Sequence, residues 1–339
     1  VAGGFVEMPE ADTEATDVAP IEQLSLEDKE LVGLTAEPKL APIEGFFEAG
    51  AYVILGASTR VGSVGHVVCQ RFVKEYASKG HKLFFINPKG GELLGQPLYK
   101  SVADLPAGFA ANGAVGVCIL PAKLAEATID QCLDVGIKYI VMIAGGFAEV
   151  GPEGAELEAR IVRKLHASGG RMIGPNCVGV YDPEAGIDTV FLDEVQVLRP
   201  TAGPISVISQ SGGMIILVMN EIMATFQGSA YIRRLLSIGN AADVNETECF
   251  EMCMRDDKTK VVWIYTEGFR DGAKLIRMIR KTACKKPVVM IKANTTAAGK
   301  QASESHTASL ASNSRVVSYL LKQAGVVRCR GWDSMFSFG

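Results

Sequence analysis

Apolar, strand-forming runs alternate with amphipathic segments along the chain from about residue 51 onward. In the first half the apolar runs are Tyr52–Leu55, Lys82–Ile86, Gly116–Leu120, Tyr139–Ile143 and Arg171–Ile173. Helical periodicity fills most of the intervals, over Val64–Tyr76, Lys123–Val135 and Glu153–His166. Because strands that alternate with helices form a parallel sheet with helices on its faces, this pattern predicts an α/β domain.

A second series of the same kind follows residues 183–204, which we interpret as a connection rich in turn residues. Its predicted strands are Ile205–Ser209, Tyr231–Leu236, Val261–Tyr265, Pro287–Ile291 and Val326–Cys329. Its predicted helices are Met214–Ala224, Thr247–Met254, Gly272–Arg280 and Ser314–Gln323. The sequence therefore predicts two successive α/β domains, and 339 residues are enough for both.

Charge is distributed unevenly, and residues 1–45 form an acidic, proline-dotted extension. Two lysines against eleven acidic residues give this extension a net charge of −9, so the rest of the chain carries +5 within the total of −4. A body that is only weakly basic suits small anionic ligands and does not favour a nucleic-acid partner. No apolar stretch approaches the ~20 residues of a membrane span, so we expect none.

The eight cysteines are scattered, and Cys249 and Cys253 form a C-x3-C pair without a second pair. This usage predicts reduced, buried thiols in an intracellular protein and no metal site. It leaves the cytoplasm and the mitochondrial matrix open as the compartment.

The first predicted strand runs into the glycine-rich turn Gly56-Ala-Ser-Thr-Arg-Val-Gly-Ser-Val-Gly65 and then into a helix. Glycines let the backbone approach a phosphate, and a helix N-terminus presents free N–H groups to it. The turn is not a P-loop, because the Gly-Lys-Ser/Thr ending is missing. The second strand ends Asn87-Pro88-Lys89, where an NAD-binding fold usually has an acidic residue. A lysine there favours coenzyme A, or NADP, over NAD, although a solvated turn lysine explains it equally well.

Three more turns follow predicted strands, where open parallel sheets place their ligands. They are residues 144–149, residues 173–179 with Asn176, and Ser209-Gln210-Ser211-Gly212-Gly213. The last turn places two hydroxyls and several N–H groups at a helix start, which favours phosphate binding. Serine hydrolysis is the weaker interpretation, because a nucleophile elbow needs Gly where Ser209 stands.

His306 is one of only four histidines and lies among hydroxyls and small residues, in Ser-Glu-Ser-His-Thr-Ala-Ser. A histidine in such a loop can carry a phosphoryl group, because its neutral form is abundant near pH 7. Glu267 follows the strand Val261–Tyr265 and could accept from one imidazole nitrogen, leaving the other nucleophilic. The alternative for Glu267 is a surface or helix-capping acid.

Taken together these motifs resemble the NDP-forming acyl-CoA synthetases, the superfamily of succinyl-CoA synthetase, and within it the α portion of ADP-forming acetyl-CoA synthetase. The resemblance rests on the motifs Gly-Ala-Ser…Gly-Ser-Val-Gly, Asn-Pro-Lys, Gly-Phe-Ala-Glu, Gly-Pro-Asn-Cys-x-Gly-Val, Ser-Gln-Ser-Gly-Gly, Gly-Asn-x-Ala-Asp-Val, Glu-Gly-x-x-Asp-Gly and Ser-His-Thr, which occur in the family's order. It implies a Rossmann-like CoA-binding domain over residues 46–190. A flavodoxin-like domain with a phosphohistidine loop would then cover residues 200–339.

The resemblance also implies residue roles and a reaction. His306 would be phosphorylated, Glu267 would orient it, and Ser209, Ser211, Gly212 and Gly213 would hold phosphate. The residues expected to bind coenzyme A or line its site are Gly56, Ser58, Gly62, Ser63, Gly65, Lys89 and Asn176. The reaction would reversibly convert acyl-CoA, ADP and phosphate into carboxylate, CoA and ATP. An ATP-grasp partner, absent from this chain, would bind ADP or ATP with Mg, so we expect a hetero-oligomer.

The chain departs from the family pattern at several positions. Ala308 and Ser312 stand where the phosphohistidine loop usually has glycines, and Ala241 stands where a lysine is common. These changes and the acidic extension support a second hypothesis, a structural or regulatory subunit of a larger assembly with the same fold and weakened catalysis. An NADP-dependent oxidoreductase is a third, less supported alternative.

Overall fold

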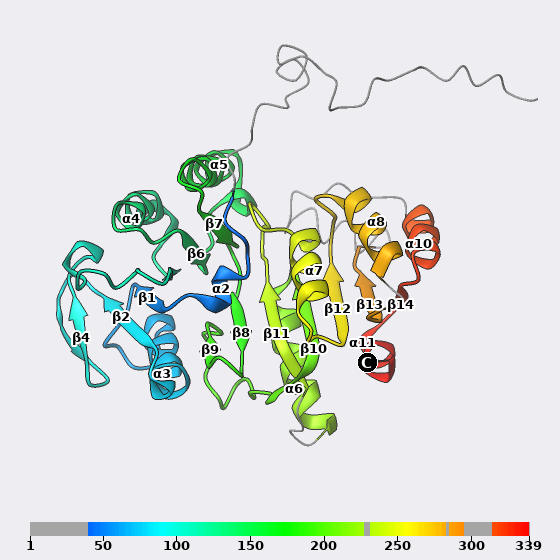
Figure 1. The fold of residues 1–339 in the computed structure, drawn as a ribbon, viewed down its shortest axis with the longest axis horizontal. Helices are drawn as coiled ribbons and strands as arrows, with labels where there is room; N and C mark the ends of the chain where they lie inside the picture. Colours follow the sequence, from blue (N-terminus) through cyan, green and yellow to red (C-terminus); the bar gives the residue numbers. More distant parts are fainter. Residues whose placement is uncertain (1–39, 227–230, 283–284, 295–313, 339) are drawn as a thin grey trace, which may run out of the picture. The chain divides into compact units, whose positions relative to one another are not determined.

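The computed structural model describes residues 40–226, 231–282, 285–294 and 314–338. Within these ranges the chain forms two seven-stranded sheets, one after the other in sequence, with helices packed on them (Figure 1). The predicted fold class, α/β with two mostly parallel sheets, is confirmed. The predictions for the acidic extension before residue 40 and for the loop that holds His306 concern residues outside these ranges.

The first sheet has the strand order β3-β4-β2-β1-β5-β6-β7. Its strands are β1 (Ala51–Leu55), β2 (Lys82–Ile86), β3 (Gly91–Leu93), β4 (Gln96–Tyr99), β5 (Ala114–Cys118), β6 (Tyr139–Met142) and β7 (Arg171–Ile173). All pairings are parallel except β3 with β4. All five residues of β1 are buried, as expected for a central strand covered on both faces. Its helical segments are α2 (Gly45–Glu48), α3 (Val64–Glu75), η2 (Ala77–Lys79), η3 (Val102–Asp104), α4 (Ala122–Asp134), η4 (Ala148–Val150) and α5 (Pro152–Ala167).

The second sheet has the strand order β14-β13-β12-β10-β11-β8-β9. Its strands are β8 (Val180–Asp182), β9 (Ile187–Asp188), β10 (Ala202–Ser209), β11 (Ile232–Ser237), β12 (Val261–Thr266), β13 (Val288–Lys292) and β14 (Val327–Cys329). Strand β8 pairs antiparallel with β11 and with β9, and the other pairings are parallel. Its helices are α6 (Gly212–Phe226), α7 (Glu246–Arg255), α8 (Gly272–Thr282), α10 (Ser314–Gln323) and α11 (Trp332–Phe338).

The interpretation of residues 183–204 as a plain connection was wrong in one respect. Residues 186–190 are all buried, and β9 pairs with β8 to form the antiparallel edge of the second sheet. A two-residue strand has no detectable period in sequence, and its position depends on the neighbouring β8, which pairs with β11. The sequence pattern also missed the β3–β4 hairpin, whose turn places Leu94 and Gly95 at positive φ, as two-residue hairpin turns require.

All seven cysteines that the structure describes are buried, and none of these seven forms a disulfide. Burial raises the pKa of Cys69 and Cys253 to about 12, which keeps both thiols protonated at neutral pH. These thiols therefore act as small apolar side chains of the core.

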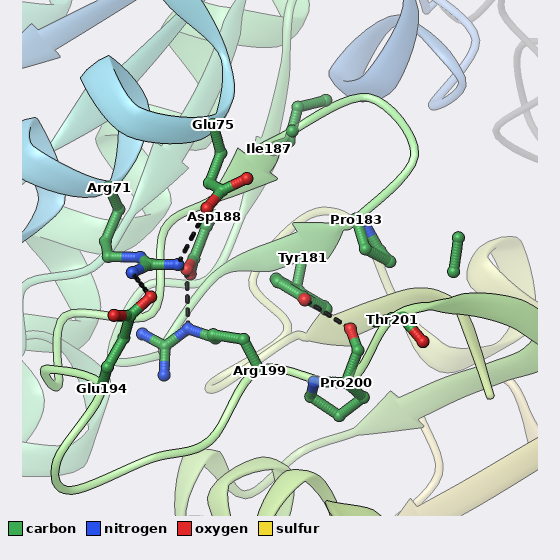
Figure 2. A pocket seen from close by; sticks show the side chains of 12 residues that line it. Arg71, Glu75, Tyr181, Pro183, Ile187, Asp188, Glu194, Arg199, Pro200 and Thr201 are labelled. Carbon is green, nitrogen blue, oxygen red and sulfur yellow. Dashed lines mark hydrogen bonds and ion pairs between the residues drawn. The ribbon is translucent and has the colours of Figure 1, made fainter. Parts of the chain in front are cut away.

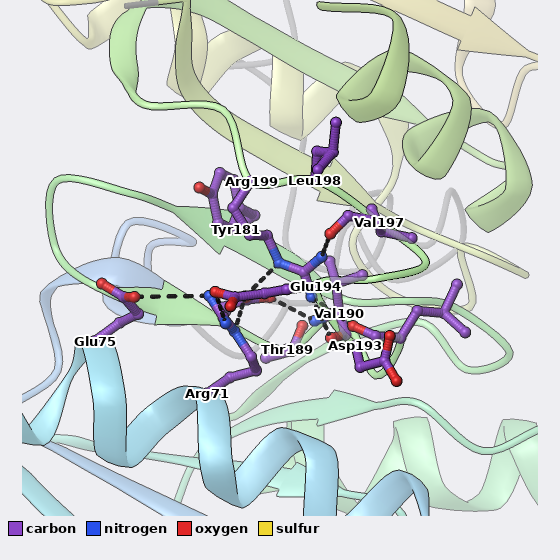
Figure 3. A network of polar contacts seen from close by, with 12 residues as sticks. Arg71, Glu75, Tyr181, Thr189, Val190, Asp193, Glu194, Val197, Leu198 and Arg199 are labelled. Atoms are coloured by element: carbon purple, nitrogen blue, oxygen red, sulfur yellow. Dashed lines mark hydrogen bonds and ion pairs between the residues drawn. The ribbon is translucent and has the colours of Figure 1, made fainter. Parts of the chain in front are cut away.

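A buried carboxylate attaches the β8–β9 hairpin to helix α3. Asp188 Oδ2 accepts from Arg71 Nε at 2.9 Å and from Arg199 Nε at 2.7 Å (Figure 2). Glu194 extends this network by accepting from Arg71 (Figure 3). It also accepts from Lys74. The Asp188 side chain is 1% exposed and the Arg71 side chain 7% exposed. Charges this deeply buried must be paired, so the network fixes the hairpin against the helix of the first sheet.

Asp243 makes a second connection between the two halves of the chain. It follows β11 and α7 follows it, yet its carboxylate accepts from Arg171 Nε on β7 at 3.1 Å and from His166 Nε2 on α5 at 2.8 Å. It also accepts from the backbone N–H of Met172 at 2.6 Å. The loop between β11 and α7 is thereby held against the amino end of β7 in the first sheet.

We predict that Asp188→Ala destabilises the protein strongly, because it leaves two buried guanidinium groups without their shared partner. The expected loss is about 3–5 kcal/mol in the free energy of unfolding. Urea denaturation at neutral pH measures it. Asp130→Ala, which removes the half-exposed partner of Lys164, is the control and should leave the urea midpoint almost unchanged. Equal midpoints for the two variants would contradict the role assigned to Asp188.

Candidate functional site

The turn between β1 and α3 is built so that the helix N-terminus can approach the strand closely. Gly56 and Gly62 have φ of +102° and +76°, which favour glycine. A Cβ on Gly65, in the first turn of α3, would overlap the carbonyl oxygen of Gly56. The glycine spacing seen in the sequence therefore has a direct steric cause, and it sets the backbone N–H groups of α3 beside the strand end.

The two predicted serines of this turn stabilise it from within. Ser58 Oγ accepts from the backbone N–H of Arg60 at 3.2 Å, and Ser63 Oγ donates to the carbonyl of Arg60 at 2.7 Å. Ser63 is the N-cap residue of α3, but its side chain does not cap the helix. The hydroxyl thus does not occupy the position where an anion would meet the first N–H groups of α3.

Lys89 lies in the turn after β2, the strand that pairs with β1 in parallel. Asn87 shapes this turn: its Nδ2 donates to the carbonyl of Ala57 at 2.7 Å, and its Oδ1 accepts from the Lys89 N–H at 2.9 Å. The Lys89 side chain is exposed. Because Asn87 joins the two turns, the structure brings Lys89 and the Gly56–Gly65 turn to the same edge of the first sheet.

A second group of polar residues forms where the first sheet meets the loop after β11. Asn240 Nδ2 donates to Glu149 Oε2 at 2.7 Å and to Glu158 Oε2 at 2.9 Å. Asn176, at φ +57°, donates from its own Nδ2 to Asn240 Oδ1 at 3.4 Å. The neighbouring Ala241 has φ +50°, a conformation unusual for alanine. Asn176 is exposed, so this group presents one amide to solvent beside two carboxylates.

Glu149 is held as a carboxylate in this group. Burial alone would raise its pKa, but hydrogen bonds from Asn240 and from the backbone N–H groups of Gly146 and Phe147 outweigh burial, so the pKa lies below its ordinary value. The Gly-Phe-Ala-Glu motif of the sequence therefore forms a small turn closed by its own glutamate.

The turn Ser209–Gly213 connects β10 to helix α6. Ser209 Oγ accepts from the Ser211 N–H at 3.1 Å and donates to the Ser211 carbonyl at 2.8 Å. The backbone of Gly212 packs against Val178, and a Cβ there would lie 2.9 Å from Val178 Cγ1. Gly213 is exposed at the start of the fifteen-residue helix α6. The helix N-terminus therefore carries small residues and hydroxyls, as the anion-binding interpretation requires.

Gln210 joins this turn to the turn that contains Glu267. Its Oε1 accepts from the N–H groups of Glu267 and Gly268, the latter at 3.0 Å, and its Nε2 donates to the Gly268 carbonyl at 3.2 Å. Lys292 Nζ, from the end of β13, donates to the Glu267 carbonyl at 2.6 Å. The structure thus brings Glu267 and the Ser209–Gly213 turn together at the carboxyl ends of β10 and β12.

The predicted residues that the structure describes fall into two groups. In the first, the segment after β7, which carries Asn176, meets the Ser209–Gly213 turn, because Val178 packs on Gly212. The N–H of Val178 also donates to Ser237 Oγ at 3.3 Å. The Gly56–Gly65 turn and Lys89 form a separate group on the first sheet. His306, Ala308 and Ser312 lie outside the described residues.

Sequence reasoning missed Gln210, Asn240, Glu158 and Lys292. Each lies in or beside a motif noticed for other residues, or in an ordinary helix or strand. Their roles come from partners 25 to 91 positions away in the chain, and no local spacing marks such pairs. Among the described residues, no helix is both long enough and apolar enough to cross a membrane.

The fold and these turns define a class of protein with two successive, mostly parallel sheets whose strand ends carry glycine- and serine-containing turns. Residues 50–183 match the model of a CoA binding domain, and residues 202–339 match that of a succinyl-CoA ligase like flavodoxin domain. The chain belongs to the NDP-forming acyl-CoA synthetases, the superfamily of succinyl-CoA synthetase.

Sequence similarity to known proteins extends over both domains. The chain is 32% identical over 290 residues to acetate–CoA ligase [ADP-forming] I subunit alpha of Pyrococcus furiosus, covering 84% of this chain and 60% of that subunit. It is 30% identical over 213 residues to succinate–CoA ligase [ADP-forming] subunit alpha 2 of Archaeoglobus fulgidus, covering 62% of this chain and 68% of that subunit.

Among solved structures, the chain superposes on a dinucleotide-forming acetyl-coenzyme A synthetase 1 of Ca. Korarchaeum cryptofilum in complex with phosphate and ADP. The TM-score is 0.77 and the identity 29%, and the match covers 87% of this chain and 61% of that one. The chain therefore spans about three fifths of the length of this structure and of the Pyrococcus subunit.

We predict that Gly65→Ala destabilises the protein, because the added Cβ overlaps the Gly56 carbonyl. The expected loss is about 3 kcal/mol in the free energy of unfolding. Gly213→Ala is the matched control, since Gly213 also lies in the first turn of a helix after a strand, with nothing closer than 3.7 Å to its Cβ position. That control should be neutral or stabilising by up to ~1 kcal/mol in urea denaturation. A stable Gly65→Ala variant would show that the close approach is not required.

Proposed function

We propose that this chain is the CoA-binding, phosphohistidine-bearing part of an ADP-forming acyl-CoA synthetase. The observation that carries the proposal is the 32% identity to an ADP-forming acetate–CoA ligase α subunit, which runs through both domains. The strand-end turns add support, because each sheet has its own turn suited to an anion.

The first sheet provides the coenzyme A site. The Gly56–Gly65 turn would accept the phosphates of coenzyme A on the N–H groups of α3, with Ser58 and Ser63 shaping the turn. Lys89 stands at the same edge with an exposed ammonium group, which suits a phosphate better than a ribose hydroxyl. Asn176 would contact the reacting end of the ligand, since it is the exposed amide of the second group.

The second sheet provides the phosphoryl site. His306 would carry the phosphoryl group, and the N-terminus of α6 with Ser209, Ser211, Gly212 and Gly213 would receive it. Glu267 would accept from the second imidazole nitrogen and orient the ring. The position of Gln210, hydrogen bonded to the Glu267 N–H, supports this arrangement, because it fixes Glu267 relative to the phosphate-binding turn.

The proposed reaction has three balanced steps. Phosphate attacks the acyl carbon of acyl-CoA, the C–S bond breaks, and CoA leaves as an acyl phosphate forms. The imidazole of His306 attacks phosphorus, and the carboxylate leaves. ADP then takes the phosphoryl group, which forms ATP and regenerates the histidine. Every step is reversible, and the overall change is acyl-CoA, ADP and phosphate to carboxylate, CoA and ATP.

A partner completes the enzyme in this proposal. An ATP-grasp subunit or domain would bind ADP or ATP with Mg, so the active form is a hetero-oligomer or a longer chain. The relatives' names support this, since two of them are α subunits. The substrate is a small carboxylate with its acyl-CoA.

We predict that Lys89→Ala weakens coenzyme A binding about tenfold, since a charged hydrogen bond to phosphate contributes ~1.5 kcal/mol. Calorimetric titration of coenzyme A measures the change. Lys82→Ala is the matched control, because Lys82 is an exposed lysine at the opposite end of the same strand. Equal affinity for the Lys89 and Lys82 variants, or tight binding of NADPH, would contradict the coenzyme A site.

We predict an acid-labile phosphoryl group on this chain when ATP, Mg and the ATP-grasp partner are supplied, and its loss in His306→Asn. The control is His81→Asn, since His81 only stacks on Tyr76 at a ring distance of 4.5 Å. Glu267→Gln should slow labelling by at least tenfold while leaving coenzyme A affinity unchanged. Labelling that persists in His306→Asn would overturn the assignment and favour a subunit without catalysis.

A further inference from the structure

A cavity of about 630 Å³ lies beside the carboxyl ends of β13 and β14, and none of its lining residues was assigned a ligand-binding role above. We call it the β14 pocket. It is lined by Lys292, Ser318, Lys322, Val326, Arg328, Cys329 and Arg330. Four of these seven residues are cationic and none is acidic.

The fold places these cations together in a regular way. In the parallel pairing of β13 with β14, Met290 lies opposite Arg328 and Ile291 opposite Cys329. Because side chains alternate between faces along a strand, Lys292 and Arg328 share the face of Met290. Arg330 follows directly after the last residue of β14. Helix α10 adds Ser318 and Lys322, which are four residues apart and therefore lie on one side of the helix.

Three of these cations, Lys322, Arg328 and Arg330, have no acidic partner among the described residues. None of the ion pairs found among the described residues includes Lys322, Arg328 or Arg330. Arg328 Nε is buried and has no hydrogen-bond partner. A buried guanidinium N–H without an acceptor is costly, so an anion in the pocket would remove that cost.

A second cavity lined by arginines differs, because the protein itself supplies the acceptor for their N–H groups. The cavity of about 330 Å³ in Figure 2 is also lined by two arginines, Arg71 and Arg199, but both donate to Asp188. The absence of an acidic partner therefore distinguishes the β14 pocket from a structural ion-pair network.

We propose that the β14 pocket binds the phosphate groups of an oligophosphate ligand, through residues other than those proposed above for coenzyme A and the phosphoryl group. Two guanidinium groups and two ammonium groups match several phosphate oxygens, and a single carboxylate would leave most of the positive charge uncompensated. Lys292 already donates to the carbonyls of Glu267 and Ala293, so it contributes charge more than a new hydrogen bond. The position at strand carboxyl ends is the usual one for ligands of parallel sheets.

The experiment is calorimetric titration of inorganic diphosphate into the purified chain and into Arg328→Gln and Arg330→Gln variants. Each substitution should weaken diphosphate binding at least tenfold and leave coenzyme A affinity unchanged. Lys123→Gln, an exposed lysine on α4, is the control and should bind diphosphate as the unmodified chain does. Thermal unfolding checks that the variants are folded.

Lys322→Gln gives an independent test from a different element, which keeps the proposal falsifiable if either arginine variant unfolds. It should also weaken diphosphate binding. If Lys89→Ala abolishes diphosphate binding while Arg330→Gln and Lys322→Gln leave it unchanged, the anion binds at the coenzyme A turn and the β14 pocket is not a site. Absence of diphosphate binding by the unmodified, folded chain overturns the proposal as well.

Discussion

The arrangement of this molecule depends on the rule that a buried carboxylate must be paired. Asp188 and Asp243 are both placed in the second half of the chain and both are satisfied by arginines of the first half, Arg71 on α3 and Arg171 on β7. Because an unpaired charge in the interior costs several kcal/mol, these contacts fix where the β8–β9 hairpin and the loop after β11 can lie. That loop carries Asn240, so the ion pairs also determine which residues meet at the strand ends.

Backbone geometry at the strand ends explains the choice of small residues there. Gly65 allows α3 to begin against the Gly56 carbonyl, and Gly212 allows α6 to begin against Val178. Both helices therefore present their N-termini at the carboxyl edge of a parallel sheet, where an anion is stabilised by N–H groups. The two turns that we propose to bind anions are thus one structural solution used twice, once for each sheet. Gln210 fixes the backbone of Glu267 beside the second turn.

The sequence could place many candidate site residues at strand ends because the signals that mark these turns are local. The glycines of the Gly56–Gly65 turn, the hydroxyls of Ser209 and Ser211, and Lys89 each follow an apolar strand directly, and their chemistry depends on their own backbone position. Asn240 and Gln210 could not be predicted, because an amide side chain takes its role from whichever groups the fold brings within hydrogen-bond distance. The β14 pocket is of the same kind, since its cations come from two strands and a helix.

The sequence alone determined the α/β class, the positions of the main strands and helices, and the family, since hydrophobic period and turn motifs act over a few residues. The structure alone decided that the short β8 and β9 strands complete the second sheet in antiparallel fashion, and that Asp188 and Asp243 join the two halves. It also decided that Lys322, Arg328 and Arg330 have no acidic partner among the described residues. The physical reason is that an ion pair or the pairing of an edge strand forms only when the fold brings together segments that are far apart in the chain. No local sequence pattern encodes that proximity.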